Sequence, residues 1–66
     1  MIQSALFDKN KFTKKQAIKK LIERGLKNNK IDVTDHYYRF RQYNPKPNEK
    51  YRTISAGEGI KYIYKI

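Results

Sequence analysis

The stretch FTKKQAIKKLIERGL, residues 12–26, has the pattern of one amphipathic helix with a signal at each end. Thr13 and Gln16 have the spacing of a capping box, in which the hydroxyl accepts from the backbone near Gln16 and the amide reaches back to the cap. Gly25 supplies the left-handed residue that ends a helix, as in a Schellman motif. These signals predict a helix over about residues 14–24.

The apolar residues of this segment repeat with the period of a helix. They are Ala17, Ile18, Leu21 and Ile22. At 100° per residue they cover an arc of roughly 140°, and the lysines fall outside it. We therefore expect this stripe to pack on another layer of structure.

The stretch YYRFRQY alternates with a period of two, which predicts a strand over about residues 37–43. Tyr38 and Phe40 share one face, which suits a core. The opposite face carries Tyr37, Arg39, Arg41 and Tyr43. Pro45 and Pro47 then end the strand, because proline cannot donate to a ladder.

Two further strands are predicted toward the C-terminus, over about residues 51–56 and 60–65. A GEG turn joins them and needs at least one residue with positive φ. In the last strand we expect Tyr62 to face inward, because burying Lys61 and Lys65 without partners would be costly.

Together these elements predict an α+β fold with one amphipathic helix packed on a three-stranded antiparallel sheet, in the order α-β-β-β. We expect a single small domain over residues 1–66. Before the first strand, Ile31 and Val33 have the spacing of a short strand or an extended segment. The expected core consists of Phe12, Ala17, Ile18, Leu21, Ile22, Leu26, Phe40, Ile54, Ile60 and Tyr62. The helix covers one face of the sheet and leaves the other open.

The composition is strongly basic, with 16 Lys and Arg against six Asp and Glu, and a formal charge of +10. The absence of cysteine excludes disulfides and thiolate metal sites. No run approaches the roughly 20 apolar residues of a membrane span, and the N-terminus lacks the pattern of a signal peptide. We expect a soluble, intracellular protein with no membrane partner.

Catalytic residues are poorly represented. His36 is the only histidine, and Asp32 and Asp35 lie in a connection without further ligands for a metal. The GEG turn precedes a strand, whereas a phosphate-cradling loop precedes a helix. We expect a protein that is not an enzyme and that uses no cofactor or metal.

An open sheet face that is both aromatic and cationic predicts a nucleic-acid-binding surface, because Lys and Arg neutralise phosphates and Tyr rings stack on bases. The expected contact residues are Tyr37, Arg39, Arg41, Tyr43, Tyr51, Arg52, Lys61, Lys15 and Lys19. Two alternatives remain. Alternating Tyr and Arg is also ordinary for a solvent-facing strand. The same face can also bind an acidic protein surface, because Tyr and Arg anchor protein interfaces.

The stretches FDKNKFTKKQAIKKLIERGLK, YYRFRQYNPKP, YRTIS and GEGIKYI together resemble a small α+β module of tailed-phage structural and head-morphogenesis proteins and of small open reading frames of large DNA viruses. The resemblance spans about residues 7–64, and it departs from the module at Lys20, where a tryptophan would stand. It implies a viral setting, in the host-cell cytoplasm or the virion, and it supports the fold without implying an activity.

Overall fold

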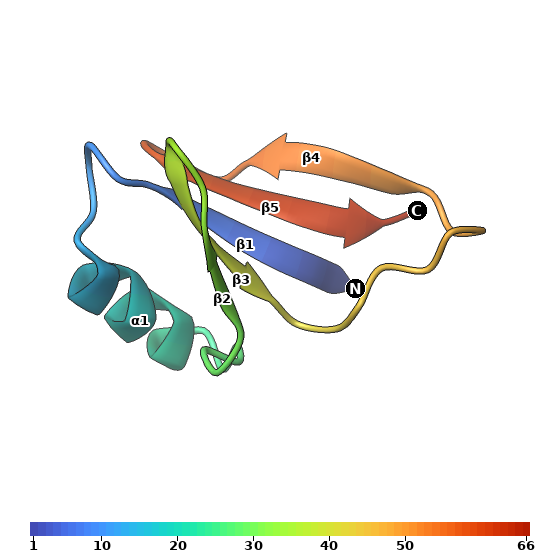
Figure 1. Ribbon diagram of the computed structural model, residues 1–66, viewed down its shortest axis with the longest axis horizontal. Coiled ribbons are helices and arrows are strands. Elements are labelled where there is room, and N and C mark those ends of the chain that lie inside the picture. Colours follow the sequence, from blue (N-terminus) through green and yellow to red (C-terminus); the bar gives the residue numbers. More distant parts are fainter.

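The computed structural model describes residues 1–66 as one helix and one antiparallel sheet of five strands (Figure 1). The elements along the chain are β1 (Ile2–Asp8), α1 (Lys14–Glu23), β2 (Ile31–Val33), β3 (Tyr37–Arg41), β4 (Tyr51–Ser55) and β5 (Ile60–Lys65). Across the sheet the order is β2-β3-β1-β5-β4. The helix-plus-sheet class is confirmed, but the predicted three-stranded sheet is wrong.

The first strand, β1, which the sequence analysis missed, is the centre of the sheet. It pairs with β3 on one side and with β5 on the other. Ser4 and Ala5 are adjacent in this strand, and both are buried. Because the polar residues Gln3 and Ser4 are buried beside Ala5, β1 shows no alternation of apolar and polar residues, which is why its sequence lacks the usual signal.

The local signals that bound α1 act as predicted. The Thr13 hydroxyl accepts from Gln16 N at 3.2 Å, and Gln16 Oε1 accepts from Thr13 N at 2.9 Å, which completes the capping box. At the other end Gly25 has a φ of 69°, and Leu26 N donates to Leu21 O at 2.9 Å. This is the six-to-one bond of a Schellman motif.

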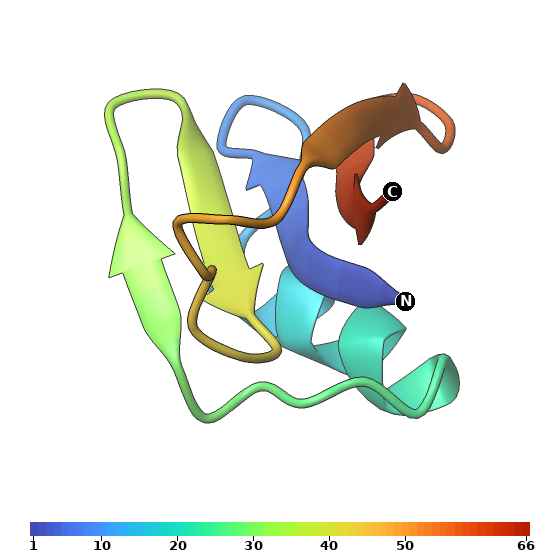
Figure 2. The ribbon, with the colours of Figure 1, turned by 90° about the vertical axis from the view of Figure 1, so that its right-hand side faces the viewer.

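The core lies between α1 and the sheet and consists of Ala5, Phe7, Ala17, Leu21, Phe40 and Tyr62. The Phe7 ring meets the Phe12 and Phe40 rings edge to face, with centroids 5.4 and 5.8 Å apart. Two predicted core residues are exposed instead, Ile22 by 63% and Ile54 by 39%. Ile54 lies on the edge strand β4, which is far from α1 in Figures 1 and 2.

The second correction to the predicted topology concerns β3 and β4, which are not neighbours. Residues 42–50 connect them across the ends of β1 and β5 (Figures 1 and 2).

The hairpin from β4 to β5 has the expected turn, with φ of 116° at Gly57 and 76° at Gly59. β2 is the short strand that Ile31 and Val33 indicated. No helix is long and apolar enough to cross a membrane.

Candidate nucleic-acid interface

The sheet has an outer face, which we define as the face turned away from α1. Because Phe40 and Tyr62 are buried in the core, the residues that alternate with them on β3 and β5 lie on the outer face. Leu6 of β1 stands between the two strands, opposite Arg39 on one side and Lys61 on the other. The period-two pattern therefore assigned the faces of β3 and β5 correctly.

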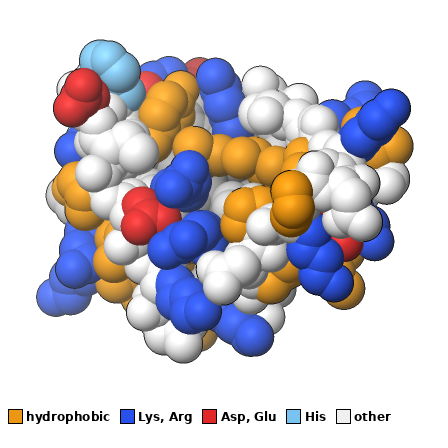
Figure 3. Space-filling view, turned by 45° about the vertical axis from the view of Figure 1, so that its right-hand side comes forward, with side chains coloured by type: hydrophobic (Ala, Val, Ile, Leu, Met, Phe, Trp, Pro, Cys, Tyr) orange, Lys and Arg blue, Asp and Glu red, His pale blue; other side chains and the backbone are white.

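Two arginines of β3 share one carboxylate on the outer face. Asp32 of β2 lies directly opposite Arg39 in the strand register. Its Oδ2 atom is 3.1 Å from Arg39 Nη2 and 2.8 Å from Arg41 Nε. Figure 3 shows an acidic side chain in contact with basic ones, and hydrophobic side chains beside them. This role of Asp32 was not predicted, although its position between two apolar residues of a short strand was a signal.

The shared carboxylate orients the two guanidinium groups without satisfying them. The only hydrogen bond that either makes through its side chain runs from Arg39 Nη2 to Asp32. Both arginines keep about a third of their side-chain surface exposed, 40% for Arg39 and 34% for Arg41. Their remaining terminal N–H groups can therefore bind a second anion in a bidentate manner.

An aromatic ring and a cation lie together near the same arginines. Lys61 Nζ of β5 is 5.5 Å from the centroid of the Tyr37 ring of β3, within the range of a cation–π contact. We call Tyr37, Arg39, Arg41 and Lys61 the β3–β5 cluster. The structure thus brings four of the predicted contact residues onto one face.

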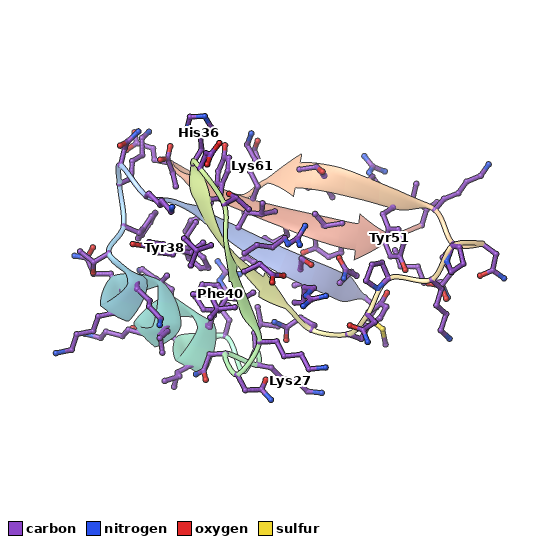
Figure 4. The ribbon with its side chains drawn as sticks, in the orientation of Figure 1. Lys27, His36, Tyr38, Phe40, Tyr51 and Lys61 are labelled. Carbon is purple, nitrogen blue, oxygen red and sulfur yellow. The ribbon has the colours of Figure 1, made fainter.

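Tyr43 and Tyr51 are held at the opposite end of the sheet from Lys61, as Figure 4 shows for Tyr51. The Tyr51 hydroxyl donates to Glu49 Oε2 at 3.0 Å and accepts from Lys46 N at 3.1 Å. Burial raises the pKa of the Tyr43 phenol above its ordinary value, and Tyr51 and Glu49 raise it further. Tyr43 lies within residues 42–50, and the hydroxyl of Tyr51 is bonded to that connection, so neither ring belongs to the β3–β5 cluster.

The other predicted contact residues lie elsewhere on the surface. Arg52 of β4 stands opposite Tyr64 in the register, so its side chain leaves the sheet on the face opposite to that of Thr53. Lys15 and Lys19 are exposed on α1 and form no ion pair. They cannot touch the same short ligand as Tyr37, because the sheet lies between them.

Positive charge is concentrated around α1 rather than on the outer face. Residues 9–30 carry nine of the 16 basic side chains and only one acidic one, Glu23. By contrast, the three cations of the β3–β5 cluster share their face with Asp32 and Asp8, which leaves one net positive charge. Long-range attraction of an anion therefore comes from α1 and the residues on either side of it. The outer face contributes short-range hydrogen bonds and ion pairs through the cations of the β3–β5 cluster.

Comparisons of the chain with protein-family models, with curated proteins and with solved structures find no match. The resemblance to the viral module therefore stays a prediction. No group of three or more His, Asp and Glu side chains lies together where it could hold a metal ion. His36 is exposed in the turn between β2 and β3 (Figure 4).

Proposed function

We propose that the protein is a non-catalytic nucleic-acid-binding protein of low sequence specificity, which contacts its ligand through the β3–β5 cluster. One observation carries the proposal. The centroid of the Tyr37 ring and Lys61 Nζ lie 5.5 Å apart, on the same face as two guanidinium groups that share one carboxylate and stay partly exposed. A ring that can stack on a base next to donors that can bind phosphate is the combination that unpaired nucleic acid requires.

Each member of the cluster has a separate task. The free terminal N–H groups of Arg39 and Arg41 bind phosphate oxygens, for which the guanidinium fork is well shaped. The Tyr37 ring stacks on a base, a contact worth about 1 to 3 kcal/mol and tolerant of base identity. Lys61 adds a phosphate contact beside the ring.

The lysines around α1 supply attraction rather than recognition. Salt screens exposed charges beyond about 8 Å at physiological ionic strength, so Lys15 and Lys19 act on a ligand mainly at low salt or along a longer strand that passes both faces. Counterion release from such contacts makes affinity fall log-linearly with salt. With the resemblance to the viral module, we place this binding in a virus-infected cell or a virion.

The test measures the anisotropy of a fluorescent, unpaired oligonucleotide with wild-type protein and with the double variant Arg39→Ala, Arg41→Ala. We expect the double variant to bind about tenfold more weakly, which corresponds to about 1.4 kcal/mol. The matched control is Lys50→Ala with Arg52→Ala, which removes the same charge away from the cluster and costs less than about threefold.

Two results would overturn the proposal. Equal reductions in affinity for the two double variants would mean that net charge alone drives binding and that the β3–β5 cluster has no special role. Indifference of the wild-type protein to nucleic acid at low salt would exclude the function altogether. Circular dichroism checks that each variant is folded, since the Arg39 and Arg41 ion pairs with Asp32 are partly exposed and contribute at most about 1 kcal/mol each.

A further inference from the structure

The outer edge of β4 carries backbone groups without partners. At one end of the strand pair Ile66 N donates to Lys50 O, and at the other end Ala56 N donates to Ile60 O, both at 2.9 Å. In an antiparallel pair, every second residue of a strand forms hydrogen bonds with the neighbouring strand. In the register of β4 with β5, the even-numbered residues from 50 to 56 therefore bond to β5. The N–H and C=O groups of Tyr51, Thr53 and Ser55 therefore point away from the sheet.

Apart from the charge of Arg52, this edge lacks the features that usually protect an exposed strand. Such edges are made very short, or carry charged side chains, proline, a bulge or a covering segment. The other edge strand, β2, is only three residues long. β4 has five residues, no proline and a regular register with β5, and four of its residues are exposed. It is a ready template for another strand.

The side chains along β4 indicate what kind of strand would fit. Arg52 and Ile54 lie on one face, Ile54 is 39% exposed, and Lys50 precedes them on the same face. β4 contains no acidic residue, and neither Lys50 nor Arg52 forms an ion pair. A second copy of this chain carries the same charge of +10, so self-pairing brings like charges together.

We propose that β4 binds an acidic, extended segment of a partner protein, which pairs antiparallel with β4 as a sixth strand. The register gives the pattern of that segment. The partner strand has an apolar residue opposite Ile54. Two positions later it has an acidic residue opposite Arg52, and two positions after that a second acidic residue opposite Lys50. The residue opposite Thr53 exchanges two hydrogen bonds with its backbone.

This site is separate from the β3–β5 cluster, because β1 and β5 lie between β3 and β4. Strand addition gives affinity through the main chain and specificity through alternate side chains. The proposal therefore goes beyond nucleic-acid binding, and each can fail without the other.

The probe is a fluorescent synthetic peptide with the sequence STVTETES, acetylated and amidated at its ends. We expect it to bind, and we expect the amide hydrogens of Tyr51, Thr53 and Ser55 to exchange more slowly in the complex. A counterpart in which lysine replaces both glutamates should bind at least about tenfold more weakly, because it repels Lys50 and Arg52.

The variant Thr53→Pro removes an outward N–H without breaking any bond between β4 and β5, and it should weaken peptide binding at least about tenfold. The control Thr53→Ala keeps the N–H and should bind within about threefold of wild type. If Thr53→Pro fails to fold, the same question is answered by methylating the amide nitrogen of the peptide residue opposite Thr53. That peptide should bind the wild-type protein at least about tenfold more weakly.

Three outcomes would overturn the proposal. The first is peptide binding that leaves the exchange rate of the Thr53 amide hydrogen unchanged. The second is binding of the lysine counterpart with the same affinity as the glutamate peptide. The third is a wild-type protein that forms a dimer in sedimentation equilibrium while the Thr53→Pro variant stays monomeric. The last result would mean that a second copy of the chain covers β4 instead.

Discussion

Replacing Asp32 with asparagine tests the β3–β5 cluster most directly. The change keeps the size of the side chain and one oxygen, and it removes the charge that holds Arg39 and Arg41. Because the three side chains of these ion pairs are 33 to 40% exposed, each ion pair contributes at most about 1 kcal/mol to stability. Loss of both pairs would therefore cost at most about 2 kcal/mol, and we expect the melting temperature to fall by no more than about 16 °C, at about 4–8 °C for each kcal/mol.

The same substitution should strengthen nucleic-acid binding. Without Asp32 the net charge of the outer face rises from one to two, and both guanidinium groups are free for phosphate. A gain of about 0.7 to 1.4 kcal/mol corresponds to about three- to tenfold tighter binding at low salt. One additional phosphate contact also steepens the slope of log affinity against log salt by about 0.7 to 0.9.

The assay is a salt series of anisotropy titrations with a fluorescent, unpaired oligonucleotide. Glu58→Gln is the matched control, because it removes one negative charge from the turn between β4 and β5, where no ion pair forms. Asp32→Asn should bind more tightly than Glu58→Gln at low salt, and this advantage should shrink as the salt concentration rises, because its slope is steeper. If a folded Asp32→Asn protein binds no more tightly than the control at low salt, Arg39 and Arg41 do not contact the ligand.

Three other predictions concern charge, packing and pH. Replacing Lys15 and Lys19 with glutamine should reduce the salt slope by about 0.7 to 0.9 for each phosphate that these lysines neutralise in the wild-type complex. An unchanged slope would exclude these two lysines from the contact with nucleic acid. Leu21→Ala should cost about 2 to 5 kcal/mol, measured by urea denaturation, because the side chain is fully buried in the core. The raised pKa of Tyr43 means that its contribution to stability is complete below the unfolded-state value of 10.0 and disappears as pH rises through the folded-state value. Tyr43→Phe should flatten that decline in denaturation measured at alkaline pH, and equal slopes for the two proteins would contradict it.

The helix could be predicted from the sequence because its signals are local. The capping box joins Thr13 to Gln16, and the Schellman bond joins Leu21 to Leu26, so neither depends on the rest of the fold. The central strand β1 could not be found in this way. Its buried residues include serine and alanine at successive positions, and only pairing with β3 and β5 shows why they are buried.

The sequence could predict only those features of the candidate site that depend on a single strand. A period of two places Tyr37, Arg39 and Arg41 on one face whatever their neighbours are. Adding Tyr51 to that group required β3 and β4 to be adjacent, as in a meander. Residues 42–50 make a nine-residue connection, whereas hairpin loops usually have about two to five residues, so the length of the loop was a signal against that adjacency.

The insertion of β1 between β3 and β5 changes what the outer face can bind. Neighbouring strands lie about 4.8 Å apart, so the backbones of β3 and β5, which carry the cationic residues, form two rows about 10 Å apart. The Lys61 side chain reaches from β5 toward β3, where its Nζ is 5.5 Å from the centroid of the Tyr37 ring. Leu6 lies between the rows, opposite both Arg39 and Lys61, and is half-buried. A continuous Tyr and Arg surface would attract any polyanion equally. Two cationic rows with an apolar residue between them instead favour a ligand that has charge at its margins and a flat apolar group in the middle, as an unpaired nucleotide strand has.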